Sequence, residues 1–123
     1  MSFPINLVAG WTCFLAGAVS GALIGLRFHE PEWLGGYASF PRRMIRLGHI
    51  ACFGLGLINI LFALSAPAGS EAAAWASRLL LVGAVTMPLN CFLTAWRRPF
   101  RHAFFVPAAS TTAGILALLV ALS

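Results

Sequence analysis

The chain has 123 residues, of which 60% are hydrophobic and only 9% are charged. An ordinary soluble domain of this size does not carry so apolar a composition, which indicates that the main solvent of the chain is a lipid bilayer. The formal net charge of +5 is explained below by membrane topology, so we do not expect nucleic acid as a partner.

Four apolar segments are long enough to cross a bilayer, whose hydrocarbon core needs about 20 apolar residues per helix. Together they use most of the chain, so nothing is left for a soluble domain. The sequence therefore predicts one all-α transmembrane domain over residues 1–123, an integral membrane four-helix bundle built as two antiparallel hairpins. The predicted helices cover residues 6–26, 47–66, 73–96 and 103–122.

Small residues recur every fourth position in three of these segments. Residues at i and i+4 share one face of a helix, and a face of small side chains lets a second helix approach closely. Three such faces exceed what one central helix needs, so we expect some of them to contact other membrane subunits or a second copy of the chain. The faces consist of Cys13, Gly17, Gly21 and Gly25; of Gly48, Cys52 and Gly56; and of Ala109, Ala113, Ala117 and Ala121.

The first connection, residues 28–44, is the longest and mixes turn formers with aromatic residues. Pro31 and Pro41 are predicted to stop helices. Aromatic rings favour the headgroup layer, so we expect this loop to lie at the membrane surface, with Glu30 and Glu32 near the arginines. The aromatic residues are Trp33, Tyr37 and Phe40.

All eight basic residues are arginine, and seven of them flank the first and third connections. Because basic residues in short loops are retained in the cytoplasm, this pattern predicts cytoplasmic loops and external N and C termini in a bacterial inner membrane. Arg78, the exception, is expected at the outer surface beside Glu71. Six arginines are predicted to hold anionic lipid headgroups: Arg42, Arg43, Arg46, Arg97, Arg98 and Arg101.

Asn59 falls within the second predicted helix, roughly 20 Å from its cytoplasmic end. An amide that faced lipid would be unsatisfied at a cost of several kcal/mol, so it must face protein. We expect Asn59 to belong to a cluster of polar residues, which has two interpretations. The cluster can bond the helices to one another, a contribution worth roughly 0.6 to 2 kcal/mol, or it can form the polar path of a minimal channel or transporter. The predicted mid-membrane polar cluster comprises Thr12, Asn59, Thr86, Asn90, Thr111 and Thr112.

The three histidines map to the cytoplasmic third of the predicted bundle: His29, His49 and His102. Two histidines on facing helices can bind haem b axially, and one can bind the magnesium of a chlorophyll-type pigment. His49 and His102 are the candidate ligands, and the alternative is that they bond backbone or headgroups. Residues 46–49, Arg-Leu-Gly-His, resemble the start of the haem-bearing second helix of haem-copper oxidase core subunits, although that family's other histidine ligands are missing.

No motif for catalysis or metal binding occurs in the sequence. The helix cores contain no acid, and no base-activated nucleophile or glycine-rich phosphate loop is present. The three cysteines are isolated and are interpreted as small packing residues. We therefore expect a non-catalytic accessory or packing subunit of a membrane complex, or a homo-oligomer. The alternatives are a haem- or pigment-binding subunit and a minimal channel or transporter.

Overall fold

The computed structural model describes residues 2–123, and this part of the chain is all α-helical with no strands. Four long helices, each long and apolar enough to cross a membrane, confirm the prediction of an all-α chain with four membrane-length helices. They are α1 (Pro4–Arg27), α2 (Phe40–Ser65), α3 (Glu71–Trp96) and α4 (Phe105–Leu122). Two short 3₁₀ helices, η1 (Trp33–Gly35) and η2 (Arg98–Ala103), lie in the first and third connections.

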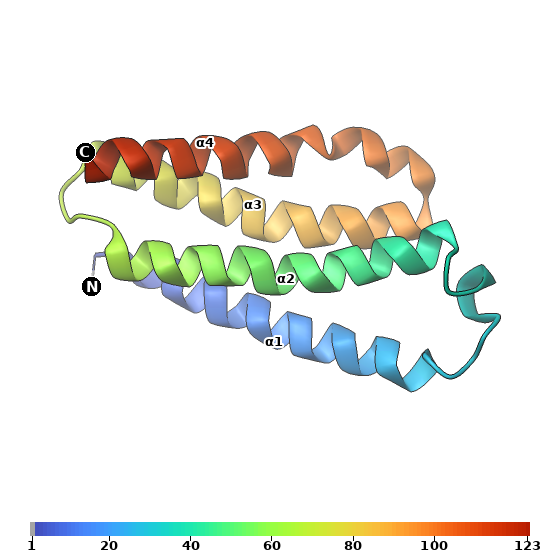
Figure 1. Cartoon of the computed structure of the whole chain (residues 1–123). Coiled ribbons are helices and arrows are strands. Elements are labelled where there is room, and N and C mark those ends of the chain that lie inside the picture. The colour runs from blue at the N-terminus through green and yellow to red at the C-terminus, as the bar shows by residue number, and fades with distance from the viewer. Residues whose placement is uncertain (1) are drawn as a thin grey trace.

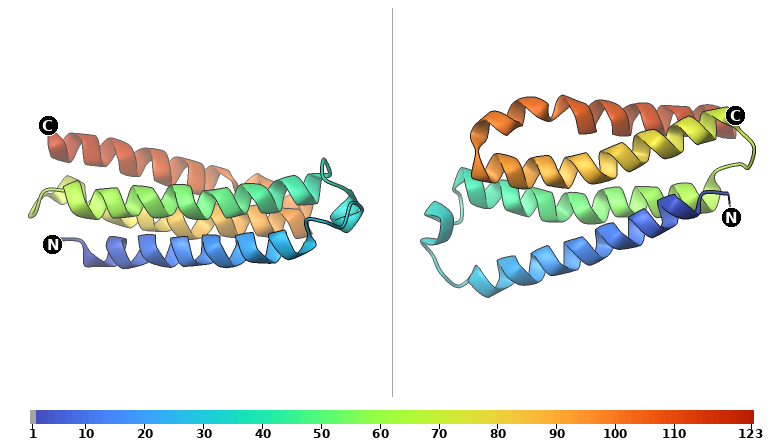
Figure 2. Two further views of the ribbon diagram at one scale, coloured as in Figure 1. Left: turned by 60° about the horizontal axis from the view of Figure 1, so that its bottom comes forward. Right: turned by 180° about the vertical axis from the view of Figure 1, so that it is seen from behind.

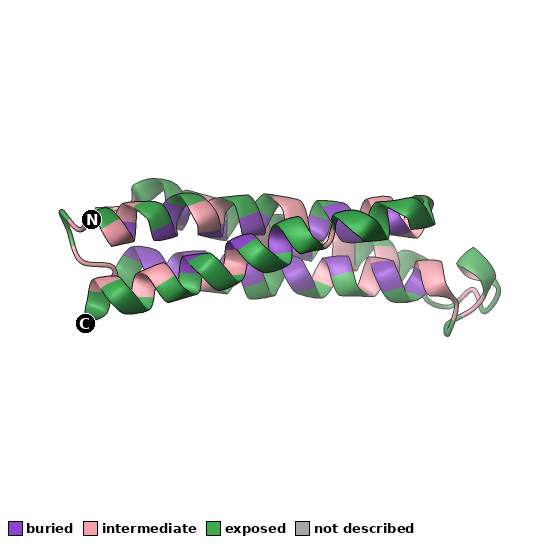
Figure 3. Cartoon of the chain, turned by 90° about the horizontal axis from the view of Figure 1, so that it is seen from above, coloured by how far each residue is buried: buried purple, intermediate pink, exposed green. Residues whose placement is uncertain are grey.

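The helices form an open bundle in which α2 and α3 are central (Figure 1). Helix α1 packs mainly on α2, and α4 packs on α3. The chain reverses direction at each connection, so the N and C termini lie at the same end as the α2–α3 connection (Figures 1 and 2). Most buried residues belong to α2 and α3, whereas α1 and α4 expose long apolar faces (Figure 3).

Helix α2 begins at Phe40, several residues before the predicted start at residue 47. The Ser39 side chain caps the helix by accepting a hydrogen bond from the Arg42 backbone N–H at 3.3 Å. Pro41 lies in the first turn, where its missing N–H needs no partner. The prediction that Pro41 stops a helix is therefore wrong, because this proline helps to start one.

The backbones of α1 and α2 approach each other closely where Gly10 meets Gly56. A Cβ on Gly10 would lie 2.7 Å from the Gly56 carbonyl oxygen, and one on Gly56 would lie 2.9 Å from the Gly10 oxygen. Further along α1, Gly17 faces the ring of Phe53, but nothing lies within 4 Å of a Cβ on Gly25. The predicted face of small residues on α1 therefore contacts α2 partly through a bulky side chain of α2, that of Phe53, and not only through close approach of the two backbones.

The alanine face predicted on α4 does not pack inward along its length. Ala109 and Ala113 are exposed, whereas Ser110 and Gly114 are buried. A Cβ on Gly114 would lie 2.9 Å from the Leu80 side chain of α3. Since consecutive residues are rotated by about 100° around a helix, burying Ser110 and Gly114 turns the preceding alanines away from α3.

Candidate functional sites

Seven arginines lie at the end of the bundle that holds the first and third connections, far from both termini (Figure 1). Arg27 pairs with Glu30 at 3.1 Å, as expected, and this is the only ion pair within residues 2–123. Arg78 lies near the opposite end, exposed, with its guanidinium 5.2 Å from the centre of the Trp75 ring. It therefore stacks on an aromatic ring and does not pair with Glu71.

Arg42 is the buried centre of the first connection, with only 3% of its surface exposed. Its guanidinium donates to the backbone carbonyls of Glu30 at 3.4 Å and Pro31 at 3.3 Å. We call its surroundings the Arg42 box, in which the guanidinium lies 5.4 to 5.8 Å from the ring centres of Phe28, Trp33 and Tyr37. The folded loop thus surrounds the charge of Arg42, and the binding of a lipid headgroup by Arg42 stays a prediction.

The other arginines of this end differ in exposure. Arg46 donates to the Tyr37 carbonyl at 2.9 Å and lies 4.1 Å from the centre of that ring. Arg98 lies 4.7 Å from the centre of the Phe40 ring, so it links η2 to the start of α2. The exposed arginines of this end are Arg27, Arg43, Arg97, Arg98 and Arg101.

We expect Arg42→Lys to release the first connection even though it keeps the positive charge. A lysine ammonium lacks the planar, forked donors that bond two carbonyls while stacking on rings. The expected loss is about 1–3 kcal/mol of unfolding free energy. Two measurements would detect the released connection: faster proteolysis within residues 28–39, and quenching of Trp33 fluorescence by a soluble quencher. Arg43→Lys, at an exposed neighbouring position, is the control, and equal effects of the two variants would contradict the structural role of Arg42.

His49 lies between α1 and α2 and is bonded to α1. Its Nδ1 is 2.9 Å from the Gly17 carbonyl oxygen and 3.2 Å from the Ser20 hydroxyl. Because a carbonyl only accepts, Nδ1 must carry the proton. A Cβ on Gly21 would lie 2.6 Å from His49 Cε1 and 3.3 Å from Nε2, so the ring edge that carries both nitrogens faces α1.

The three histidines do not come together. His102 is exposed on η2, and His29 is exposed after the end of α1, whereas His49 faces α1 from within the bundle. Two axial ligands must face each other across one macrocycle. His49 and His102 are not brought together as a pair in this structure, and the binding of a haem or pigment by His49 and/or His102 stays a prediction. Within residues 2–123 no group of three metal-ligating side chains gathers.

Asn59 is fully buried in a polar cluster that joins three helices. Asn6 of α1 donates to the Asn59 side-chain oxygen at 2.8 Å. The Ser77 hydroxyl of α3 donates to the Asn6 side-chain oxygen at 2.5 Å. Asn59 itself donates to the backbone carbonyls of Leu55 at 3.0 Å and Leu80 at 3.2 Å. We call Asn6, Asn59 and Ser77 the amide cluster.

The amide cluster lies nearer the terminal end of the bundle than predicted. Helix α2 begins at Phe40, so Asn59 is roughly 28 Å from the start of that helix. It also has different members, because Thr12 and Thr86 each donate to a carbonyl of their own helix. The proposed contacts of Asn59 with Thr12, Thr86, Thr111 and Thr112 are wrong: Thr112 is exposed, and the buried Thr111 hydroxyl has no partner among the described residues.

Asn90 lies at the arginine-rich end, apart from Asn59, and anchors η2. With its amide oriented to suit its neighbours, its nitrogen donates to the Phe100 carbonyl at 2.9 Å and its oxygen accepts from the Phe104 N–H at 3.3 Å. Asn59 and Asn90 therefore do not form one polar path. The sequence analysis missed Asn6 and the role of Asn90, since both depend on which residues of helices far apart in the sequence lie at the same depth in the bundle.

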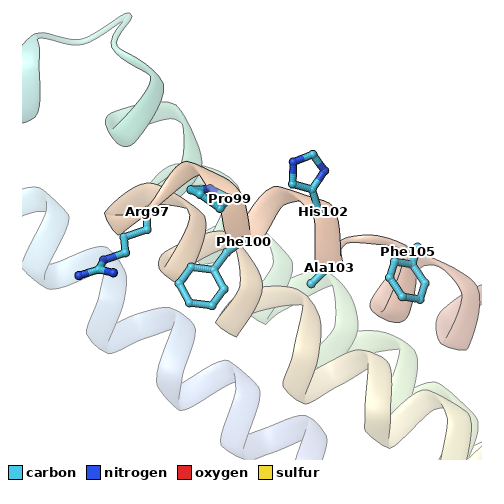
Figure 4. A pocket seen from close by; sticks show the side chains of 6 residues that line it. All are labelled: Arg97, Pro99, Phe100, His102, Ala103 and Phe105. Carbon is cyan, nitrogen blue, oxygen red and sulfur yellow. The ribbon is translucent and has the colours of Figure 1, made fainter.

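Two hollows adjoin η2. The outer one, about 520 Å³, is lined by residues of η2 and its flanks, with Ala103 between the rings of Phe100 and Phe105 and with Arg97 and His102 extending from the ribbon (Figure 4). The inner one, about 260 Å³, lies between α3 and α4. Its surface is almost entirely apolar, and the residues that line it are Thr86, Leu89, Asn90, Leu93, Phe100, Ala103, Val106 and Pro107.

Comparison of the chain with protein-family models, curated proteins and solved structures finds no match. Four helices of this length and hydropathy are those of a small multi-pass membrane protein.

Proposed function

We propose that this chain is a non-catalytic packing or accessory subunit of a bacterial inner membrane, assembled with other membrane subunits or with copies of itself. The observation that carries the proposal is the amide cluster, in which buried polar side chains of three helices bond to one another and to helix carbonyls. Polar groups used in this way hold helices together.

The outer helices supply the surface for assembly. Helix α1 and helix α4 bury few residues, and both present long apolar faces on the outside of the bundle. On α4 the exposed Ala109 and Ala113 lie one turn apart and would let another helix approach closely. Chemical crosslinking in native membranes followed by mild extraction tests the proposal. A lone monomer that co-purifies with no other protein would contradict it.

We also propose that the arginine-rich end faces the cytoplasm and that both termini lie outside. Seven of eight arginines at one end support this orientation, because the cytoplasmic side retains basic loops. In intact cells, a membrane-impermeant maleimide should label Ala68→Cys in the α2–α3 connection. It should label Glu32→Cys only after permeabilisation. The unmodified chain, whose cysteines all lie within helices, is the control, and the reverse pattern would overturn the orientation.

A further inference from the structure

The two hollows beside η2 are neighbours, because Phe100 and Ala103 line both of them. Asn90 holds η2 above the inner hollow through its bonds to Phe100 and Phe104. Away from η2, helices α3 and α4 pack closely at Gly114, where an added Cβ would lie 3.2 Å from the Leu80 backbone nitrogen. We call the combined space the η2 groove.

The η2 groove changes chemistry along its length. Its inner part lies beside Leu89 and Leu93, in the last turns of α3, and it faces Val106 of α4. Its outer part reaches the connection where the span ends, and Arg97 and His102 line it there. Exposed Arg98 and Arg101 lie in the same short helix. None of the three acidic residues of the chain lines either part.

The change from an apolar inner part to a basic outer part matches one class of ligand. A hollow of about 260 Å³ is smaller than the pockets that enclose drug-sized molecules, roughly 300–1,000 Å³, but it can take part of one acyl chain. Arginines at the level of the membrane surface attract anionic headgroups. We propose that the η2 groove binds one anionic phospholipid, with an acyl chain between α3 and α4 and the phosphate beside Arg97.

The purified full-length chain in non-ionic detergent allows a direct test. Native mass spectrometry would count bound phosphatidylglycerol, phosphatidylcholine with the same acyl chains, and inorganic phosphate. We expect one phosphatidylglycerol to bind at a concentration at least about fivefold below that needed for phosphatidylcholine, since one arginine near an anionic group is worth about 1 kcal/mol. Binding of inorganic phosphate as tightly as the lipid would overturn the proposal.

Two variants separate the groove from the general charge of this end. Arg97→Gln should weaken phosphatidylglycerol binding about fivefold, whereas Arg43→Gln, an exposed arginine outside the groove, should not change it. Ala103→Trp should fill the groove and abolish binding of the single lipid, and Ala108→Trp, at an exposed position of α4, should not. If Ala103→Trp loses its helical circular dichroism, the comparison of Arg97→Gln with Arg43→Gln still tests the proposal, because both substitutions are at exposed positions.

Three further results would contradict the proposal: equal binding of both phospholipids, equal effects of Arg97→Gln and Arg43→Gln, or loss of a dimer, without loss of lipid, in folded Ala103→Trp. The last would assign the groove to a second copy of the chain. The inference does not depend on the accessory role, because the titration uses the isolated chain.

Discussion

Gly10→Leu is expected to force α1 away from α2 and to lower the free energy of unfolding by about 2–3 kcal/mol. The first added carbon would already lie 2.5 Å from Ile60 Cγ1 and 2.7 Å from the Gly56 carbonyl oxygen. A side chain can rotate away, but a backbone oxygen moves only with its helix. The strain therefore separates the two helices at this point of close approach, beside the amide cluster.

Gly25→Leu is the matched control for Gly10→Leu, because it makes the same change in the same helix. Nothing lies within 4 Å of a Cβ on Gly25, so the variant should unfold like the unmodified chain or be slightly more stable, since leucine favours a helix more than glycine does. Unfolding of both proteins in mixed micelles, followed by tryptophan fluorescence, would measure the difference. Equal stabilities of the two variants would show that close backbone approach at Gly10 does not matter.

The four spans were predictable because hydrophobic length and turn residues are local properties of a sequence. The start of α2 was missed for a local reason as well. Pro41 was interpreted as a helix stop, yet Ser39 two residues earlier is a favoured N-cap, and proline is well tolerated in a first turn. Reading the two residues together would have placed the helix start correctly.

The partners of Asn59 were harder to predict because they depend on the relative heights of three helices. Threonine was a poor choice of partner, since its hydroxyl can bond a carbonyl one turn back in its own helix, as Thr12 and Thr86 do. An amide has both donors and an acceptor to satisfy, which favours another amide such as Asn6. The two asparagines, one in each of the first two predicted helices, were visible in the sequence. The relative position of the two helices, which brings Asn6 to Asn59, was not.

The role of Arg42 could not be read from the sequence. Its position next to Arg43 suggests a basic surface, and only the folded loop brings three aromatic rings and two carbonyls around one guanidinium. The same holds for the hollows beside η2, where Asn90 bonds the backbone of the connection between α3 and α4. Contacts of this kind depend on loop conformation, which composition and periodicity do not specify.

Asn59→Leu is expected to lower the free energy of unfolding by about 1–3 kcal/mol, because it removes the acceptor of the Asn6 amide in a buried site. Asn6→Leu should cost at least as much, since Asn6 bonds both Asn59 and Ser77. Thr12→Val is the control and should change stability by less than about 0.5 kcal/mol, because the exposed Thr12 hydroxyl bonds only its own helix.

A double-mutant cycle distinguishes a bonded cluster from two independent polar residues. If Asn6 and Asn59 stabilise each other, the variant with leucine at both positions should be more stable than the sum of the single losses predicts, by about 0.5–3 kcal/mol. The second substitution removes a group that the first has already left unpaired, so its cost falls. Strictly additive losses would mean that the 2.8 Å contact contributes no coupling, and the proposal that these amides hold α1 against α2 would fail.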